Sequence, residues 1–433
     1  GRWIARFPSL YSSANNHLVA ESAALYILGT VAPQLPESAG WRAIGIQRLA
    51  KECDRQIFPD GAGAEQSPTY LAYTLEWLLL TRVVGDAGNA EKMPAIDAAL
   101  HRGALFISRI ADVRGNIPFF GDCDDGVVLR PVLKDVNYLD SIVSSVAGVL
   151  QDAEVVHPAF SADLRAKLLA GGSVPDSALQ LQSSVFQDGG YTVLRSGDGP
   201  RETYLLFDHG PLGFAHTAAH GHADALSVWL HIDGVPVFVD FGTYRYNADS
   251  GWRDWARHTA AHNTLEIDGE SQSEITGPFN WGRRAQGSLL DVEIGTAVQH
   301  CRASHDGYQD LLGVTHERQV TLDQSGSITI SDSLSGTGQH AVKSSFHVGP
   351  DATAELLPGN KVLIRLLDTL VLELTVDYPG LQCDIVSQGG NLEPGPGAVS
   401  RGYNDLVAAQ SIIVSGNVEV PCRSSVTIRR LSA

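Results

Sequence analysis

The sequence has 433 residues, of which 43% are apolar and 18% are charged, so it belongs to a globular protein and not to a disordered chain. Its length allows two or three domains, and we expect two. The 31 basic and 49 acidic residues give a formal net charge of −18, which argues against a general nucleic-acid or anionic-membrane binder. A polyanionic substrate would need a local cluster of cations.

The spacing of the cysteines and the lack of long apolar runs exclude further classes of protein. The five cysteines lie far apart, form no CxxC pair and are odd in number, so neither a disulfide framework nor a thiolate zinc site is indicated. Without an apolar run of about eighteen residues, no membrane-spanning helix is expected. The chain begins with Gly-Arg-Trp and not with methionine, so we expect a processed or trimmed product.

Residues 16–170 are predicted to be helical, because apolar residues recur there at helical spacing. Loops rich in proline, glycine and aspartate separate the helices. We place this helical domain at residues 1–175. The predicted helices cover residues 17–31, 41–57, 70–84, 96–110 and 138–150.

The sequence after Gly171-Gly172 changes to short β-branched and aromatic runs broken by turns, as in residues 191–194, 327–330 and 370–374. With no helical pattern between them, such strands predict an antiparallel β-sandwich domain over residues 176–433. The expected fold class is therefore α+β and multidomain, with a helical half followed by a β half.

Polar residues that could be functional lie at the starts of two predicted helices. Asn16-His17 begins the first helix, with Glu21 one turn later on the same face; an asparagine there is ordinarily an N-cap. Ser67 is a cap for the third helix and Tyr70 lies in its first turn, where a tyrosine packs more often than it catalyses. The aspartate-rich residues 121–126 lack the ligand spacing of an EF-hand and are interpreted as a turn.

A metal site is predicted around a hairpin. Asp233-Gly234 lies between two apolar runs, a pattern typical of a β-hairpin turn. Folding about this turn brings Asp240 back to the end at which His222 enters, and His262 stands at the entrance of a neighbouring predicted strand. Two imidazoles and a carboxylate suit zinc, with a fourth position for water or another group. The alternative is that these are separate polar residues at strand ends, which is the commoner case for any single histidine.

His220 lies two residues before His222, so in an extended segment both side chains point to one side. If His222 holds a metal, His220 lies beside it and can serve catalysis or charge neutralisation. The alternative makes His220 a second ligand or a loop residue.

Together these segments resemble the heparinase II/III family of polysaccharide lyases, including the related oligoalginate lyases. Each motif is weak alone, but six of them in the family's order span nearly the whole chain. The matching segments are Asn16-His17, Glu65-Gln66-Ser67-Pro68-Thr69-Tyr70, residues 121–126, His220-Gly221-His222-Ala223-Asp224, residues 240–246 and residues 257–264.

The resemblance implies an incomplete (α/α) toroid followed by an antiparallel β-sandwich, with an acidic polysaccharide in the cleft between them. It also implies one zinc ion, mainly structural, held by His222, Asp240 and His262, the trio that the hairpin argument reaches. Family members have more helices before the Asn-His pair, so either the toroid is short here or an N-terminal segment is missing.

The implied reaction is β-elimination at a uronic acid, which leaves a 4,5-unsaturated uronate at the new non-reducing end. Asn16 and His220 would neutralise the substrate carboxylate and stabilise the developing enolate. Tyr70 would be the acid that protonates the leaving oxygen, and either His17 or Tyr70 the base that removes the C5 proton. The uronate epimer decides which residue is the base. Tyr70 alone can act where the proton and the leaving group are on the same side of the ring, whereas a His17 and Tyr70 pair suits opposite sides.

The resemblance also suggests substrate contacts. Arg253 or Arg257 would assist in neutralising the substrate carboxylate. Tyr246 and Tyr73 are second choices for the catalytic tyrosine, and Glu21 has a weaker claim as the partner that orients His17. The candidate substrate-binding residues are thus Glu21, Tyr246, Arg253 and Arg257.

Two alternative functions stay open. A zinc hydrolase would use the histidine and aspartate trio to activate water, with Asp224 as the nearby carboxylate base, although no HExxH helix supports it. A non-catalytic protein that binds acidic glycans would be expected to lack Asn16, His17 and Tyr70, and all three are present.

The substrate and location are expectations from chemistry. The family acts on heparan sulfate, heparin, alginate, hyaluronan and bacterial exopolysaccharides. The low cationic content favours a polymer charged by carboxylates alone, such as alginate or an exopolysaccharide. Because an enzyme on polymeric glycans is most useful outside the cytoplasm, we expect a periplasmic or secreted protein.

Overall fold

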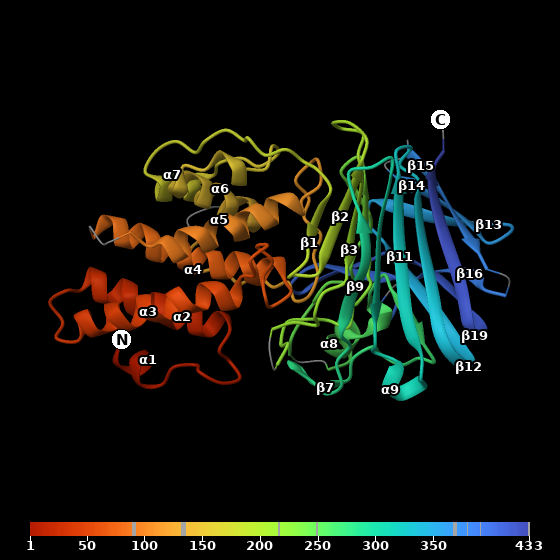
Figure 1. Cartoon of the computed structure of the whole chain (residues 1–433), viewed down its shortest axis with the longest axis horizontal. Helices are drawn as coiled ribbons and strands as arrows, with labels where there is room; N and C mark the ends of the chain where they lie inside the picture. The colour runs from red at the N-terminus through yellow and green to blue at the C-terminus, as the bar shows by residue number, and fades with distance from the viewer. Residues whose placement is uncertain are drawn as a thin grey trace. The chain divides into compact units, whose positions relative to one another are not determined.

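The structure, a computed structural model, describes residues 1–88, 92–130, 136–214, 217–247, 250–366, 370–378, 380–389 and 391–431. The chain forms two compact units. Figure 1 follows it from helices, coloured red to yellow, to strands, coloured mostly green to blue. The α+β multidomain class expected from the sequence is confirmed.

The first unit is helical and contains Gly1–Ala111 and Asp125–Leu181, with a short piece near residue 214. Its longer helices lie where the apolar periodicity predicts them, whereas α1 was not indicated, because it is short and buries no side chain. No helix in the described part of the chain is both long and apolar enough to cross a membrane. The elements are α1 Arg2–Arg6, α2 Asn16–Val31, α3 Ser38–Gln56, α4 Pro68–Ala87, α5 Pro94–Arg109, α6 Tyr138–Leu150, η1 Ala153–Val155 and α7 Leu164–Ala170.

Side-chain caps fix the starts of α2 and α4. The side chain of Asn15 accepts a hydrogen bond from the backbone N–H of His17 at 3.2 Å, so Asn15 is the cap and Asn16 is the first helical residue. Ser67 Oγ accepts from the backbone N–H of Tyr70 at 3.2 Å, as predicted for a cap, and Pro68 occupies the first turn, where proline is well tolerated. The candidate catalytic residues of the helical unit therefore lie in first helical turns.

The second unit is built on a large antiparallel sheet and contains Asp112–Asp124, Gln182–Gly213 and Ala218–Ala433. The main path of the sheet runs β1-β2-β3-β4-β5-β12-β19-β15-β14-β13. The long strands β12 and β19, side by side in Figure 1, are paired along most of their length.

The strands of the second unit are β1 Ser184–Phe186, β2 Tyr191–Ser196, β3 Thr203–Asp208, β4 Val228–Ile232, β5 Val235–Phe238, β6 Leu265–Ile267, β7 Ile275–Gly277, β8 Asn280–Trp281, β9 Gly287–Glu293, β10 Val298–His305, β11 Thr315–Asp323, β12 Ile328–Val348, β13 Ala352–Leu357, β14 Lys361–Leu366, β15 Leu370–Asp377, β16 Gln382–Ser387, β17 Ala398–Gly402, β18 Asp405–Ala408 and β19 Gln410–Arg430. Buried and partly exposed residues alternate along β10 and β11, so one face of these strands packs on the core. Strand β3 is buried throughout.

The hairpin predicted about Asp233-Gly234 is confirmed, because β4 pairs antiparallel with β5. The two turn residues have φ angles of 55° and 71°, which a two-residue turn of type I′ requires. Glycine takes such an angle without strain. After the turn, β5 runs back along β4, so the chain returns to the end of the hairpin at which β4 begins.

Two details of the β half differ from expectation. The strand predicted after His262 is β6, which pairs with β12 and with neither strand of the hairpin. Helical segments also interrupt the strands, although no helical pattern was expected there. They are too short for a helical period to be read from the sequence. These segments are α8 Ser250–Arg257, η2 Thr259–Ala261 and α9 Gln309–Leu312.

Residues 112–124 lie between helices in the sequence but belong to the β unit. Asp112 Oδ2 lies 2.8 Å from Nδ1 of His231 on β4. Trp229, on the same strand, donates its indole N–H to the backbone oxygen of Phe119 at 3.0 Å. The segment is thereby attached to the hairpin, and the division of the chain differs from a single boundary near residue 175.

Candidate active site and metal centre

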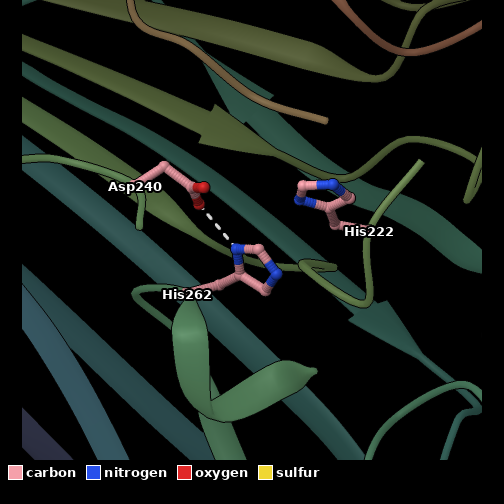
Figure 2. A group of neighbouring side chains, drawn as sticks. All are labelled: His222, Asp240 and His262. Carbon is pink, nitrogen blue, oxygen red and sulfur yellow. Dashed lines mark hydrogen bonds and ion pairs between the residues drawn. The ribbon is translucent and has the colours of Figure 1, made fainter. Parts of the chain in front are cut away.

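His222, Asp240 and His262 come together in the β unit, as the hairpin argument predicts. One ligand atom from each lies within 4.8 Å of the others, and all three side chains are buried. Nδ1 of His262 and Oδ2 of Asp240 are 2.6 Å apart, and Figure 2 shows this hydrogen bond with His222 on a separate loop. Among the described residues, no other group of three such side chains meets this distance. We call these three residues the metal cluster.

The side chain of Asn263 fixes the loop that carries His262. Its Nδ2 donates to the backbone oxygens of Val228 and Val239, at 2.8 and 2.9 Å, across the end of the hairpin. Its Oδ1 accepts from the backbone N–H of His347 on β12 at 2.7 Å. Asn263 is fully buried, so these bonds hold the loop at the end of the hairpin where the metal cluster lies.

Two buried ring nitrogens fit a metal ion. Nδ1 of His222 and Nε2 of His262 have no hydrogen-bond partner within the described part of the chain, and a buried polar atom left unpaired is costly. Burial lowers the pKa of His222 to about 4, so its imidazole is neutral, which is the metal-binding form. Burial alone would raise the pKa of Asp240, but the adjacent His262 holds that pKa below its usual value. A carboxylate with two imidazoles is a donor set that suits zinc.

Asp122, which the sequence pattern places in a turn, is fully buried beside the metal cluster. Its Oδ1 lies 3.0 Å from Nε2 of His222, and its Oδ2 lies 3.0 Å from Nδ1 of His220. Arg253 donates to both carboxylate oxygens, with Nη2 2.8 Å from Oδ2. Burial alone would raise the pKa of Asp122, but Arg253 and the two histidines hold it well below its usual range. Asp122 is therefore ionised.

A tight loop turns His220 and His222 toward the same carboxylate. A Cβ atom on Gly221 would lie 1.5 Å from the backbone oxygen of Leu212, so only glycine fits between the two histidines. The segment is a loop and not an extended strand, yet the two side chains still meet on one side, at Asp122. The backbone oxygen of His220 also accepts from the N–H of Asp122 at 2.8 Å.

Tyr246 lies beside Arg253, the arginine that pairs with Asp122. Its hydroxyl donates to Oδ2 of Asp124 at 3.0 Å, and its ring packs edge-on against Phe279 and Tyr403, with centroids 5.3 and 5.5 Å away. The guanidinium of Arg253 lies 4.9 Å from the centre of the ring. Tyr246 therefore contributes to the surroundings of the Asp122 site, and its contact with substrate stays a prediction.

The two candidate substrate-binding arginines are buried, with 1% of Arg253 and none of Arg257 exposed. Arg257 donates to the backbone oxygens of Gly277 and Asn280, at 2.6 and 3.3 Å, and lies over the ring of Trp281. Both arginines thus support the local fold, Arg253 at Asp122 and Arg257 at the β7–β8 hairpin. A direct contact with substrate stays a prediction for each.

Asn16 is paired with Glu65 in the helical unit. Its Nδ2 donates to Oε1 and Oε2 of Glu65, at 2.9 and 3.1 Å, and both side chains are buried. The next residue, Gln66, has a φ angle of 54°, a strained backbone conformation of the kind that collects at functional sites. The loop before α4 is therefore held in an unusual shape at the point where it reaches Asn16.

The other candidates of the helical unit are more accessible. Tyr70 is half-buried and His17 is exposed. Glu21 accepts hydrogen bonds from the backbone N–H and the hydroxyl of Ser9, at 2.8 and 2.7 Å. A role for Glu21 in orienting His17 stays a prediction.

Three residues of the site were not singled out from the sequence. Asp122 and Glu65 lie within segments that carry the family resemblance, but nothing local distinguishes them from a turn residue and a loop residue. Asn263 also lies in such a segment, residues 257–264, and directly follows the predicted ligand His262. All three act through partners at least 24 residues away.

Two family descriptions match the chain. Heparinase II/III-like, C-terminal, matches residues 179–427, and Heparinase II/III N-terminus matches residues 3–135. The first covers more than half of the sequence, and the two follow each other in the family's order. The chain therefore belongs to the heparinase II/III family.

Curated relatives are similar over part of their length. A heparin-sulfate lyase of Bacteroides thetaiotaomicron is 24% identical over 363 residues, which are 80% of this chain and 48% of the relative. A heparin-sulfate lyase of Pedobacter heparinus is 24% identical over 335 residues, which are 76% of this chain and 46% of that relative. An alginate lyase of Stenotrophomonas maltophilia is 38% identical over 105 residues, or 22% and 13% of the two chains. The chain spans about half the length of the two heparin-sulfate lyases.

Solved structures share the fold. The heparan sulfate lyase from Pedobacter heparinus has a TM-score of 0.75 at 19% identity, with 100% of this chain and 62% of that chain covered. A structure of heparinase III has a TM-score of 0.77 at 19% identity, with 99% and 63% covered. At this level of identity the likeness establishes the fold alone.

Proposed function

We propose that this protein is a polysaccharide lyase that cleaves a uronic-acid-containing acidic polysaccharide by β-elimination. The product carries a 4,5-unsaturated uronate at its new non-reducing end. The observation that carries the proposal is the buried Asp122 carboxylate, which holds His220 next to the metal cluster. Membership of the family and relatives named heparin-sulfate lyase and alginate lyase support it.

Neutralisation of the substrate carboxylate is the first requirement of the reaction. We assign this role to Asn16 and His220, whose N–H groups donate to the carboxylate and stabilise the enolate that forms as the C5–H bond breaks. Hydrogen bonds hold Asn16 to Glu65 and His220 to Asp122. The donors are thus oriented before substrate binds, which lowers the cost of reorganisation during the reaction.

Proton transfer completes the elimination. A base, His17 or Tyr70, takes the C5 proton, and the electron pair of that bond becomes the C4–C5 double bond. The C4–O4 bond breaks, and the hydroxyl of Tyr70 protonates the departing oxygen. Tyr70 alone acts as base and acid on a substrate whose C5 proton and leaving group are on the same side of the ring. His17 as base and Tyr70 as acid suit a substrate in which they are on opposite sides.

We assign a structural role to one zinc ion at the metal cluster. When bound by His222, Asp240 and His262, zinc supplies a fixed positive charge that ties together three loops of the β unit. The two unpaired buried nitrogens support this assignment. No proton transfer in the proposed reaction passes through the metal.

We extend the proposal to the substrate class, the details of the fold and the location of the protein. Relatives named heparin-sulfate lyase favour a glycosaminoglycan, while the formal charge of −18 favours a polymer with few sulfates, alginate included. We further propose that the helices form an incomplete (α/α) toroid, that the sheet forms a β-sandwich, and that the protein acts in the periplasm or outside the cell.

The test uses ultraviolet absorbance of the unsaturated uronate during incubation with heparan sulfate, hyaluronan, alginate and bacterial exopolysaccharides. Tyr70→Phe removes only the hydroxyl of the proposed acid. Tyr11→Phe is the matched control, because Tyr11 is 92% exposed in the same unit. We expect absorbance to rise with one polymer, to stay flat in Tyr70→Phe and to be unchanged in Tyr11→Phe.

Other outcomes reject parts of the proposal. Full activity of Tyr70→Phe would transfer the acid role to Tyr73 or Tyr246. New reducing ends without absorbance would indicate a hydrolase, for which Asp224 is the nearby carboxylate. Binding of a polymer without either signal would indicate a glycan-binding protein.

A further inference from the structure

One carboxylate contacts two histidines that have different proposed roles. Oδ2 of Asp122 lies 3.0 Å from Nδ1 of His220, and Oδ1 lies 3.0 Å from Nε2 of His222. All three side chains are at least nine-tenths buried, so bulk water does not compete for these bonds. The histidines are about 100 residues from the aspartate in sequence, so this contact is a product of the fold.

The charge of the carboxylate determines which nitrogen of each ring carries a proton. An ionised carboxylate only accepts hydrogen bonds, and the two hydrogen bonds from Arg253 hold Asp122 in that form. The proton of His220 that faces Asp122 is therefore on Nδ1. The proton of His222 that faces Asp122 is on Nε2.

For His222 this assignment places the lone pair on Nδ1. That nitrogen is the one with no hydrogen-bond partner in the described structure, and it belongs to the metal cluster. A ligand histidine whose other nitrogen donates to a carboxylate is the usual second contact of metal sites, and it fixes both the tautomer and the ring orientation. For His220 the same carboxylate fixes the ring that is assigned to the substrate.

We propose that Asp122 is a positioning residue that sets the tautomer of His222 and the ring orientation of His220 together. The metal centre and the catalytic histidine are then coupled through one carboxylate. The part concerning His220 rests on the proposed function, whereas the part concerning His222 rests on the metal cluster alone.

Arg253 makes the coupling rigid. Besides its two bonds to Asp122, it donates its Nε–H to the backbone oxygen of Pro278 at 2.9 Å. Its guanidinium also lies 5.1 Å from the ring centre of Phe279, a ring that packs edge-on at 5.9 Å from that of His220. A planar guanidinium bound at both carboxylate oxygens leaves Asp122 one orientation. Each oxygen is thus directed to one histidine.

The test compares Asp122→Asn with Asp125→Asn in the full chain. Asparagine keeps the shape of Asp122 but removes its charge, so one histidine faces an NH2 group in place of an acceptor and the other keeps only a neutral, weaker acceptor. We expect kcat on the cleaved polymer and the affinity for zinc each to fall by about 10- to 100-fold, with KM changed by less. Asp125 is exposed in the same loop, and its variant should keep both values. Equal kcat and zinc affinity in the two variants would overturn the proposal.

A double-mutant cycle separates positioning from general support. If Asp122 acts on catalysis through His220, Asp122→Asn lowers kcat in the native background but adds no loss of kcat to His220→Ala. The loss of zinc affinity remains in both backgrounds, because it passes through His222. Losses of kcat that multiply in the double variant would overturn the coupling to His220.

A further measurement serves if Asp122→Asn does not fold. Nitrogen NMR of the native protein with labelled histidine, assigned with His220→Gln and His222→Gln, reports which ring nitrogens carry protons. We expect a proton on Nδ1 of His220 and on Nε2 of His222; a proton on Nδ1 of His222 would overturn the proposal. If the native protein cleaves no polymer, the proposed function fails, while zinc affinity and NMR still test Asp122.

Discussion

The side-chain nitrogen of Asn16 donates to both carboxylate oxygens of Glu65, and this buried pair joins residues 49 positions apart. Because Glu65 offers only acceptors, the NH2 end of the Asn16 amide must face it. The orientation of Asn16 is therefore set by a neighbour that has no proposed contact with substrate. A hydrogen bond to a charged group is also stronger than one between neutral groups.

Glu65→Gln should lower kcat by about 10- to 100-fold, the scale of one hydrogen bond to a charged group. Glutamine removes the charge and replaces one of the two acceptor oxygens with an NH2 group, so the hydrogen bonds that orient the Asn16 amide are weakened. Steady-state kinetics measured by uronate absorbance would show the loss mainly in kcat. Glu37→Gln is the control, because Glu37 forms an exposed pair with Arg2. Equal kcat in native protein and Glu65→Gln would contradict this role.

His222→Ala should lose zinc and stability together, because metal binding contributes to the folding free energy. We expect the free energy of unfolding to fall by about 3–5 kcal/mol, as is typical for loss of a metal and a buried side chain. Metal analysis and denaturant unfolding measure the two effects. His300→Ala removes a more exposed imidazole paired with Asp291 at 3.0 Å and should keep its zinc. Full zinc in His222→Ala would show that the ligand assignment is wrong.

Gly221→Ala should damage the site more than its single added methyl group suggests. Its Cβ would lie 1.5 Å from the backbone oxygen of Leu212, so the loop between His220 and His222 must move. We expect reduced zinc content and a loss of about 3 kcal/mol or more in unfolding free energy, by the overpacking mechanism. Gly402→Ala meets nothing within 4 Å and should change stability by less than about 0.5 kcal/mol. Similar unfolding curves for the two variants would refute the argument.

The stability of the β unit should depend on pH through His209. Burial lowers the pKa of this imidazole to about 4, from 6.5 in the unfolded chain. The unfolded state binds the proton more readily, so the contribution to stability is present above pH 6.5 and is lost as the pH falls through 4. The loss amounts to about 3 kcal/mol at 1.4 kcal/mol per pKa unit.

His209→Gln should flatten this pH dependence, because glutamine does not titrate. Urea unfolding between pH 7 and pH 4 gives the slope for each protein. The native protein should lose stability more steeply than the variant over this range. Equal slopes would mean that His209 is not the group that takes up the proton.

Features encoded by neighbouring residues could be predicted from the sequence. The caps at the starts of α2 and α4 need only a few consecutive residues, and so does the turn at Asp233-Gly234. The turn also places two residues of the metal cluster, since the hairpin itself brings His222 and Asp240 to one end, whereas the strand after His262 pairs with β12 and not with the hairpin. The most local signals thus gave the most accurate predictions.

Features that depend on distant partners could not be predicted. The pairing of β6 with β12 joins segments about 75 residues apart, and hydrophobic alternation does not say which strand is the neighbour. Asp122 shows the same limit, because an aspartate in a glycine-bounded loop has the pattern of a turn whether or not it is buried. Its burial is determined by Arg253 and two histidines from another part of the chain.

The attachment of residues 112–124 to the β4–β5 hairpin has a consequence for how this protein can be divided. A fragment that starts at residue 176 would contain the metal cluster but would lack Asp122, and with it the carboxylate that His220 and His222 share. A helical fragment that ends at residue 175 would carry that aspartate without its partners. The two units are interleaved along the polypeptide, so neither can be exchanged or expressed as a cassette cut at a single point.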